Sequence, residues 1–175
     1  MLARRSWWRR VLVSGSAASA LSGIVACELS RRENRAPLAA INAVSHWLYG
    51  PVAYGADRPS LRHTLPGIIV HHASSLFWGA LYQSLLHSVV DRRVGGEDRP
   101  ARRGHPTEAD RWASAAVVTA IAALTDLRLV PPRLSPGFEH RLSRSGVSLV
   151  YLGFAGGLAL GSAERPGGSS SPFNV

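Results

Sequence analysis

The chain has 175 residues, of which 46% are hydrophobic and 18% are charged, and its formal net charge is +9. This length is typical of one domain. All 20 basic residues are arginines, and they are spread over every segment between the apolar stretches. This spread argues against a nucleic-acid-binding protein, which would gather them on one face or tail. The single cysteine, Cys27, excludes an internal disulfide framework and a cysteine-cluster metal site.

Four apolar stretches are each about as long as the ~20 residues that cross a bilayer core. Charged residues or prolines bound them, and they cover residues 11–29, 66–90, 112–130 and 146–163. The sequence therefore predicts an all-α protein, a four-helix transmembrane bundle that forms a single domain over residues 1–163. The Gly- and Ser-rich segment 164–175 is predicted to be a disordered tail.

The first apolar stretch has a second interpretation. Arg4 and Arg5, followed by Ser6, Trp7 and Trp8, resemble the start of a signal peptide, and the four residues that end at Cys27 fit a lipoprotein cleavage site. A lipoprotein is normally soluble after cleavage, whereas this chain would keep three further apolar stretches. We therefore favour an uncleaved helix over a leader that comprises residues 1–26.

The distribution of arginines predicts the orientation. Four precede the first span, six lie in the segment 91–112 and one lies in the tail, against five in 30–65 and four in 128–145. The positive-inside rule then favours a protein of the inner (plasma) membrane with both termini in the cytoplasm. Four spans also place segments 30–65 and 131–145 on one side.

A short amphipathic helix is predicted in the first loop, over residues 37–49. Pro37 suits a first helical turn, and Asn42, His46 and Tyr49 fall on one helical face. Trp47 and Tyr49 are typical of the headgroup zone. We expect this helix to lie at the membrane interface.

Two spans carry small residues at a spacing of four, which lets helix backbones approach closely in a membrane. These residues are Gly153, Gly157 and Gly161 in the fourth span, and Gly15, Ser19 and Gly23 in the first. Packing within one chain is favoured. The alternative is a homodimer, or contact with another membrane protein, through these faces.

Polar residues gather at one depth of the bundle. His71 and His72 follow the start of the second span by about five residues, and Asp126 precedes the end of the third by four, so antiparallel helices bring them to one level. Ionisable groups at this depth are costly and mark a functional candidate. The candidate cluster comprises Asn42, His46, His71, His72, Asp126, Arg128 and Glu139. Along the second span, one stripe joins His72, Ser75, Gly79, Gln83 and His87.

Three interpretations of this cluster stay open. The favoured one is structural: His71 or His72 pairs with Asp126 and joins two helices, because buried polar groups need partners. Metal or haem binding by His46, His71 and His72 is the second, since imidazole is a common ligand. Handling of protons or small solutes by a carrier is the third.

No catalytic motif is visible, so the sequence gives no support for an enzyme. It has no GxSxG elbow, no phosphate-binding glycine loop and no paired carboxylates. No cofactor is expected. The predicted partner is the lipid bilayer.

Three segments carry a resemblance to a family. They read INAVSHW at 41–47, LPG at 65–67 followed by HHASSLFW at 71–78, and VPPRLSPGFE at 130–139. Over residues 11–162 the chain resembles small bacterial four-span membrane proteins of unknown function. The resemblance implies the same topology and implies that the polar cluster belongs to the family's pattern.

The function expected from the sequence as a whole is a structural or interaction role in the bacterial inner membrane.

Overall fold

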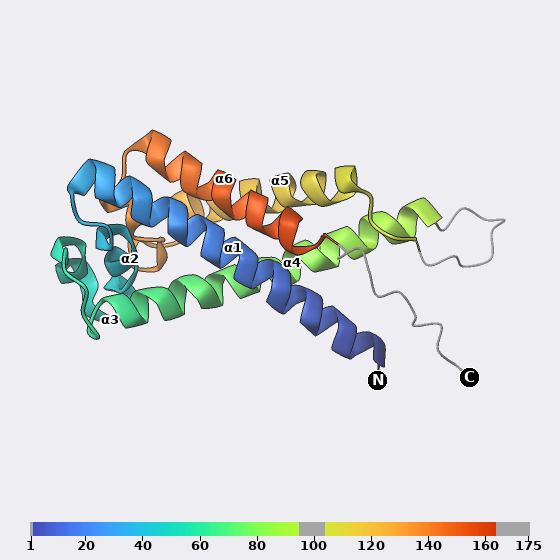
Figure 1. The fold of residues 1–175 in the computed structure, drawn as a ribbon, viewed down its shortest axis with the longest axis horizontal. Helices are drawn as coiled ribbons and strands as arrows, with labels where there is room; N and C mark the ends of the chain where they lie inside the picture. The colour runs from blue at the N-terminus through green and yellow to red at the C-terminus, as the bar shows by residue number, and fades with distance from the viewer. Residues whose placement is uncertain (1, 95–103, 164–175) are drawn as a thin grey trace, which may run out of the picture.

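The computed structural model describes residues 2–94 and 104–163, and every regular element within these ranges is helical (Figure 1). The body consists of α1 (Leu2–Asn34), α4 (Thr64–Val94), α5 (Glu108–Leu124) and α6 (Arg144–Gly161). The predicted all-α class is thus confirmed. The tail predicted at 164–175 lies outside the described residues.

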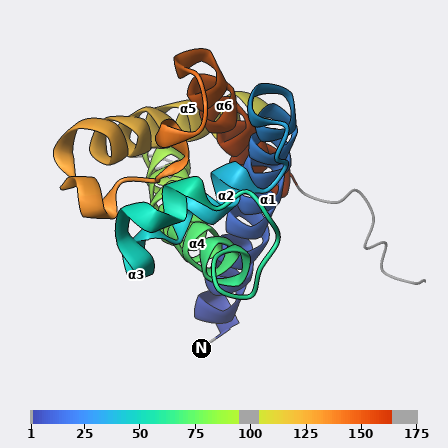
Figure 2. The same ribbon diagram turned by 90° about the vertical axis from the view of Figure 1, so that its left-hand side faces the viewer.

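The short elements lie together at one end of the long helices (Figures 1 and 2). They are α2 (Ala39–Val44), α3 (His46–Tyr49) and the 3-10 turns η1 (Gly50–Gly55), η3 (Pro132–Leu134) and η4 (Phe138–His140). The segment between α1 and α4 and the segment between α5 and α6 therefore meet, in agreement with the arrangement expected of four antiparallel helices.

The helix ends follow from local chemistry. The side chain of Thr107 accepts the amide of Asp110 and that of Ser143 accepts the amide of Gly146, which caps the starts of α5 and α6. Beyond the end of α1, Arg35 takes the left-handed conformation, with φ of 55°. After α5 the chain continues as a π-helix, η2 (Thr125–Leu129), and it then reaches Pro131, which cannot supply the amide that a further turn requires.

The glycines of α6 lie against α1. A Cβ atom added at Gly157 would come within 2.4 Å of Ala18 Cα, and one at Gly161 within 2.8 Å of Ser14 Cα. Only glycine permits such backbone contact. The small-residue faces of α1 and α6 thus pack on each other within the chain, as the favoured interpretation of the glycine spacing expects.

A second face of α1 packs on α4. A Cβ atom at Gly79 would lie 3.0 Å from Gly15 Cα, while Gly23 faces the ring of His71 at 3.8 Å. Helix α1 is therefore in contact with α6 on one side and α4 on another. The middle of the predicted polar stripe on α4, Ser75, Gly79 and Gln83, is buried there, whereas His87 at its end is exposed.

The predicted interfacial helix at 37–49 is wrong in two respects. Ser45 divides it into α2 and α3, and all six residues of α2 are buried instead of lying along the surface. The reason is the run of small side chains on α2, which lets α4 approach until a Cβ at Gly67 would meet the Ile41 carbonyl oxygen at 2.1 Å. Outward-facing side chains are found on α3, where Leu48 is 62% exposed, although His46 at its start is buried.

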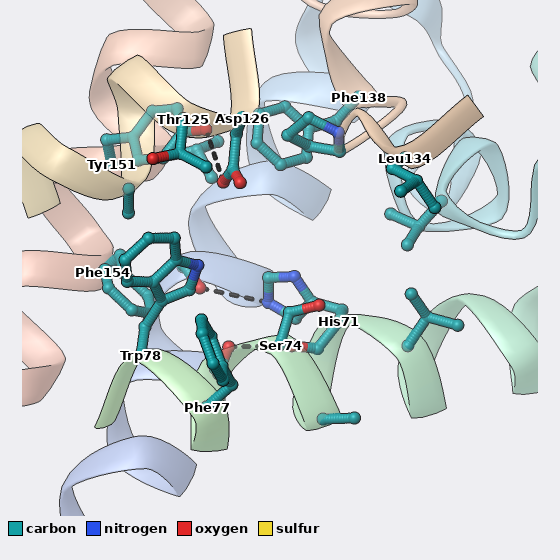
Figure 3. A pocket seen from close by; sticks show the side chains of 18 of the residues that line it. His71, Ser74, Phe77, Trp78, Thr125, Asp126, Leu134, Phe138, Tyr151 and Phe154 are labelled. Atoms are coloured by element: carbon teal, nitrogen blue, oxygen red, sulfur yellow. Dashed lines mark hydrogen bonds between the residues drawn. The ribbon is translucent and has the colours of Figure 1, made fainter. Parts of the chain in front are cut away.

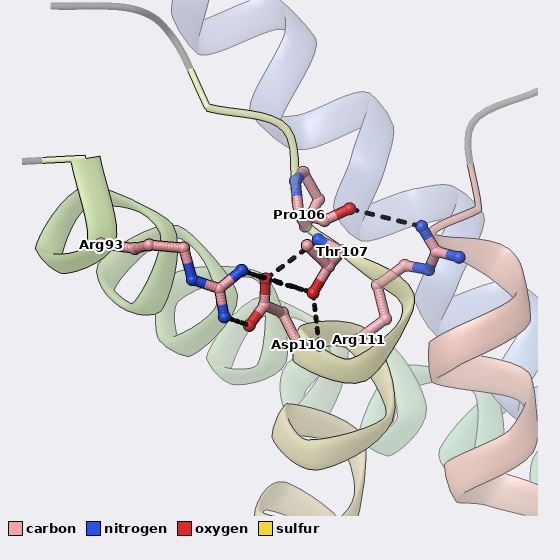
Figure 4. Close-up of polar contacts among 5 residues, drawn as sticks. All are labelled: Arg93, Pro106, Thr107, Asp110 and Arg111. Atoms are coloured by element: carbon pink, nitrogen blue, oxygen red, sulfur yellow. Dashed lines mark hydrogen bonds and ion pairs between the residues drawn. The ribbon is translucent and has the colours of Figure 1, made fainter.

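An ion pair joins the far ends of α4 and α5 (Figure 4). The guanidinium of Arg93 binds both carboxylate oxygens of Asp110, whose side chain is 5% exposed. The same carboxylate accepts the amide of Thr107 at 2.9 Å and its hydroxyl at 2.7 Å. This contact therefore combines a helix cap with a link between neighbouring helices.

Two of the helices are long and apolar enough to cross a membrane, by length and composition. They are Ser6–Asn34 and the continuous helix Glu108–Leu129.

Candidate functional site

A pocket of about 420 Å³ lies among α1, α4, the end of α5 and α6, below the loop that carries η3 and η4 (Figure 3). Its lining is mostly apolar and includes many aromatic rings. Those rings belong to Trp47, Phe77, Trp78, Phe138, Tyr151 and Phe154. Its polar lining residues are Ser22, His71, Ser74, Ser75, Thr125 and Asp126. An apolar cavity of this size with a few polar groups is typical of small-molecule sites.

The π-helix η2 carries Asp126 to the pocket wall. Its wider turn is visible in the bond from the Val130 amide to the Thr125 carbonyl oxygen, 3.0 Å across five residues. Such turns occur frequently at functional sites. The Tyr151 hydroxyl donates to Asp126 Oδ2 at 3.1 Å, and Figure 3 shows the carboxylate pointing into the pocket.

His71 reaches the pocket from α4 and bonds to α1. Its Nε2 lies 3.2 Å from the Ser19 carbonyl oxygen and 3.1 Å from the Ser22 hydroxyl. Because a carbonyl oxygen only accepts, Nε2 carries the hydrogen and donates it. The Ser22 hydroxyl can accept this hydrogen because its own is donated to the Ala18 carbonyl oxygen at 2.7 Å.

The predicted pairing of a histidine with Asp126 is therefore wrong. Both His71 and Asp126 line the pocket, but in the described chain they bind Ser22 and Tyr151 instead of each other. His72, the other candidate, is half-buried beside the pocket and is not one of its lining residues. The sequence predicted correctly that His71 and Asp126 lie at one depth, and both line one pocket. Their hydrogen-bond partners, Ser22 and Tyr151, were not predicted.

Asn42 and His46 support the loops and do not line the pocket. The Asn42 amide donates to the carbonyl oxygens of Ala56 at 2.8 Å and Arg58 at 3.0 Å, and its oxygen accepts the Thr64 hydroxyl at 2.7 Å. Both ring nitrogens of His46 face carbonyl oxygens, those of Ala43 at 2.9 Å and Pro132 at 3.3 Å. The buried His46 ring thus joins α2 to η3.

The last two candidates lie outside the cavity lining. Arg128 is exposed. Glu139 is half-buried, and its Oε2 is buried with no hydrogen-bond partner in the described ranges. Burial, and then the negative charge of Glu139, raise the pKa of Tyr54. Arg141, two residues after Glu139, was not a candidate from the sequence. It connects the segment after η4 to the segment around η1 by contacts to the Tyr54 carbonyl oxygen and the Asp57 carboxylate.

Metal binding by the histidines finds no support in the geometry. Within residues 2–94 and 104–163, no group of three or more His, Cys, Asp or Glu side chains is placed to hold a metal ion. The pocket residues that sequence reasoning missed are chiefly aromatic. Tyr151 and Phe154 could have been predicted to line the site, because they lie on one face of α6 at a depth that matches Asp126.

Comparison with known proteins adds no further assignment. No protein-family model matches the chain, and searches of curated proteins and of solved structures find no significant match.

Proposed function

We propose that this chain is a four-span integral membrane protein of the bacterial inner membrane, with both termini in the cytoplasm, and that it has a structural or interaction role. The observation that carries the proposal is the distribution of side chains. Each long helix turns large apolar side chains outward, while many of the polar side chains of α1, α4 and α5 lie inside.

The outward residues are found on every long helix. They include Ile24 on α1 at 65% exposure, Phe77 on α4 at 60%, Leu124 on α5 at 56% and Leu152 on α6 at 66%. The buried polar side chains in these helices include Ser14, Ser22, Ser30, Ser75, Gln83, Asp110, Ser114 and Thr119. Large apolar side chains exposed on all four long helices are unfavourable in water and are suited to lipid.

The mode of packing supports the same proposal. Helices in lipid gain little from hydrophobic burial and associate through close contacts between small residues and through interhelical hydrogen bonds. The α1–α6 contact uses Gly157 against Ala18, and the amide of Gln83 on α4 donates to the Ser14 hydroxyl on α1 at 3.0 Å. The arginine-rich segments at the helix ends fit headgroup positions.

Ligand binding, as in a small carrier, is the second candidate function. The pocket favours it, since an apolar cavity of this size with a few polar groups, here including the Asp126 carboxylate, is typical of small-molecule sites. The two candidates are compatible, because an interaction protein can also bind a small molecule.

Reporter fusions test the topology. A fusion after Val175 and one within 91–111 should report cytoplasm, while a fusion near Asp57 should report the external side. The protein should also stay in the membrane pellet after alkaline washing. If the fusions within 91–111 and near Asp57 report the same side, the four-span proposal is wrong.

A further inference from the structure

The charge of the pocket lining is opposite to that of the chain. The chain has 20 arginines and a net charge of +9, yet no arginine of residues 2–94 and 104–163 lines the pocket. Among these described residues, Asp126 is the sole acidic residue of the lining. We propose that the pocket binds a hydrophobic organic cation, with its charge against Asp126 and its apolar groups among the aromatic rings.

The Asp126 carboxylate has capacity for such a ligand. A carboxylate offers two oxygens with about four acceptor positions. In the described chain, Asp126 accepts one hydrogen bond, from Tyr151 to Oδ2, and Oδ1 has no protein donor. Two arginines of the neighbouring segments do not fill this role: Arg128 is exposed, and Arg141 binds Tyr54 and Asp57. A cation would supply the missing counter-charge.

The aromatic rings stand on two sides of the carboxylate. Phe138 and Tyr151 form an edge-to-face pair with centroids 6.0 Å apart, and Phe77 and Trp78 form another at 5.2 Å. Figure 3 shows the first pair beside Asp126 and the second across the cavity. Ring faces attract cations, and organic cations lose little hydration when they enter such a cavity. An anion would gain nothing from either group.

His71 offers a second acceptor for the same ligand. It donates through Nε2 to α1, and its Nδ1 has no hydrogen-bond partner in the described chain. In a neutral imidazole that donates through Nε2, Nδ1 is an acceptor. The Trp47 indole hydrogen is already donated to the Ser135 carbonyl oxygen at 2.9 Å. Asp126 Oδ1 and His71 Nδ1 are thus two lining atoms that accept no hydrogen bond within the described chain.

The pocket opens on the outer flank of α4. Ala73 and Phe77 line it and are exposed, and they continue a face that also presents Ile69 and Leu81. In the proposed membrane placement this flank faces lipid, where hydrophobic cations dissolve. Access from the bilayer rests on the proposed function, whereas binding itself does not.

The test uses two probes of matched shape and opposite charge, tetraphenylphosphonium and tetraphenylborate. Binding to the purified full chain in a non-ionic detergent is measured by equilibrium dialysis. We expect saturable binding of tetraphenylphosphonium and at least about tenfold weaker binding of tetraphenylborate. Equal affinity for the two probes, or no saturable binding of tetraphenylphosphonium, overturns the proposal.

Variants locate the site. Asp126→Asn should weaken tetraphenylphosphonium binding by about tenfold or more, while Asp91→Asn, at an exposed carboxylate outside the pocket, should not change it. Trp78→Leu should weaken binding several-fold, whereas Trp112→Leu, at an exposed ring outside the lining, should not. Unchanged affinity in both Asp126→Asn and Trp78→Leu overturns the proposal, and the second variant decides if the first does not fold.

The outcome is separable from that of the proposed function. Loss of cation selectivity in detergent would leave the membrane topology untouched. Conversely, reporter fusions that contradict four spans would leave a measured cation site in place and remove only its access from lipid.

Discussion

Tyr151 on α6 donates its hydroxyl to Asp126 at the π-helical end of α5, across 3.1 Å. Tyr151→Phe removes this bond and leaves the carboxylate without a protein donor. Polar contacts between membrane helices average about 0.6 kcal/mol, and a stranded carboxylate adds to the cost. We expect a lower midpoint of thermal unfolding in detergent. Tyr49→Phe is the control, since the Tyr49 hydroxyl has no hydrogen-bond partner in the described chain; equal midpoints for the two variants would contradict the role of this bond.

Neighbouring glycines on α6 should respond differently to the same substitution. In Gly157→Ala the new Cβ would lie 2.4 Å from the Ala18 backbone, so the helices must separate, at about 1–3 kcal/mol. In Gly156→Ala the nearest atom is Leu21 Cδ2 at 3.4 Å, an ordinary contact, and helix propensity favours alanine. Thermal unfolding followed by circular dichroism should show a loss for the first variant only. Equal behaviour would mean that the α1–α6 contact is looser than described.

A double-mutant cycle distinguishes the observed partners from the predicted ones. His71→Ala and Ser22→Ala remove two ends of one hydrogen bond, so their effects on the free energy of unfolding should not add. His71→Ala and Asp126→Ala should couple less strongly than the first pair, because these residues line one pocket but bind different helices. The measurement is unfolding in detergent for the single and double variants. Coupling of His71 with Asp126 that exceeds its coupling with Ser22 would contradict the partners seen in the structure.

Asp110 should matter more than its neighbour in the first turn of α5. Asp110→Ala removes the acceptor for the amide and hydroxyl of Thr107 and for the guanidinium of Arg93. We expect a loss of about 1–2 kcal/mol, the range for helix caps. The matched change Glu108→Ala, at an exposed acidic residue of the same turn, should cost little. Indistinguishable unfolding curves for the Asp110→Ala and Glu108→Ala variants would show that the cap and the ion pair do not stabilise the contact between α4 and α5.

The apolar stretches and the glycine spacing predict the positions of the long helices and one of the contacts between them. The stretch predicted at 146–163 is α6 (Arg144–Gly161) within two residues, and Gly153, Gly157 and Gly161 do meet α1. These features depend on composition along one helix, which a sequence displays directly.

Contacts between helices are harder to predict. Position in a span fixes the depth of Asp126 but not its rotation, and the π-helical turn changes that rotation relative to a regular α-helix. The sequence therefore predicted the common depth of Asp126 and His71 but gave Asp126 the wrong partner. Burial of α2 was missed for a related reason, because Asn42 and His46 look like a polar face until the loop carbonyls that they bind are known.

Helix α1 has a consequence for how the protein matures. Its Ala18 and Ser14 receive the glycines of α6, and its Gly15 receives Gly79 of α4. Cleavage in front of Cys27 would remove all three residues at once, leaving α6 and α4 with glycine grooves and nothing to fill them. For this chain, processing at that site would remove the helix against which both α4 and α6 pack their glycines, so retention of residues 1–26 is a condition for these two interfaces.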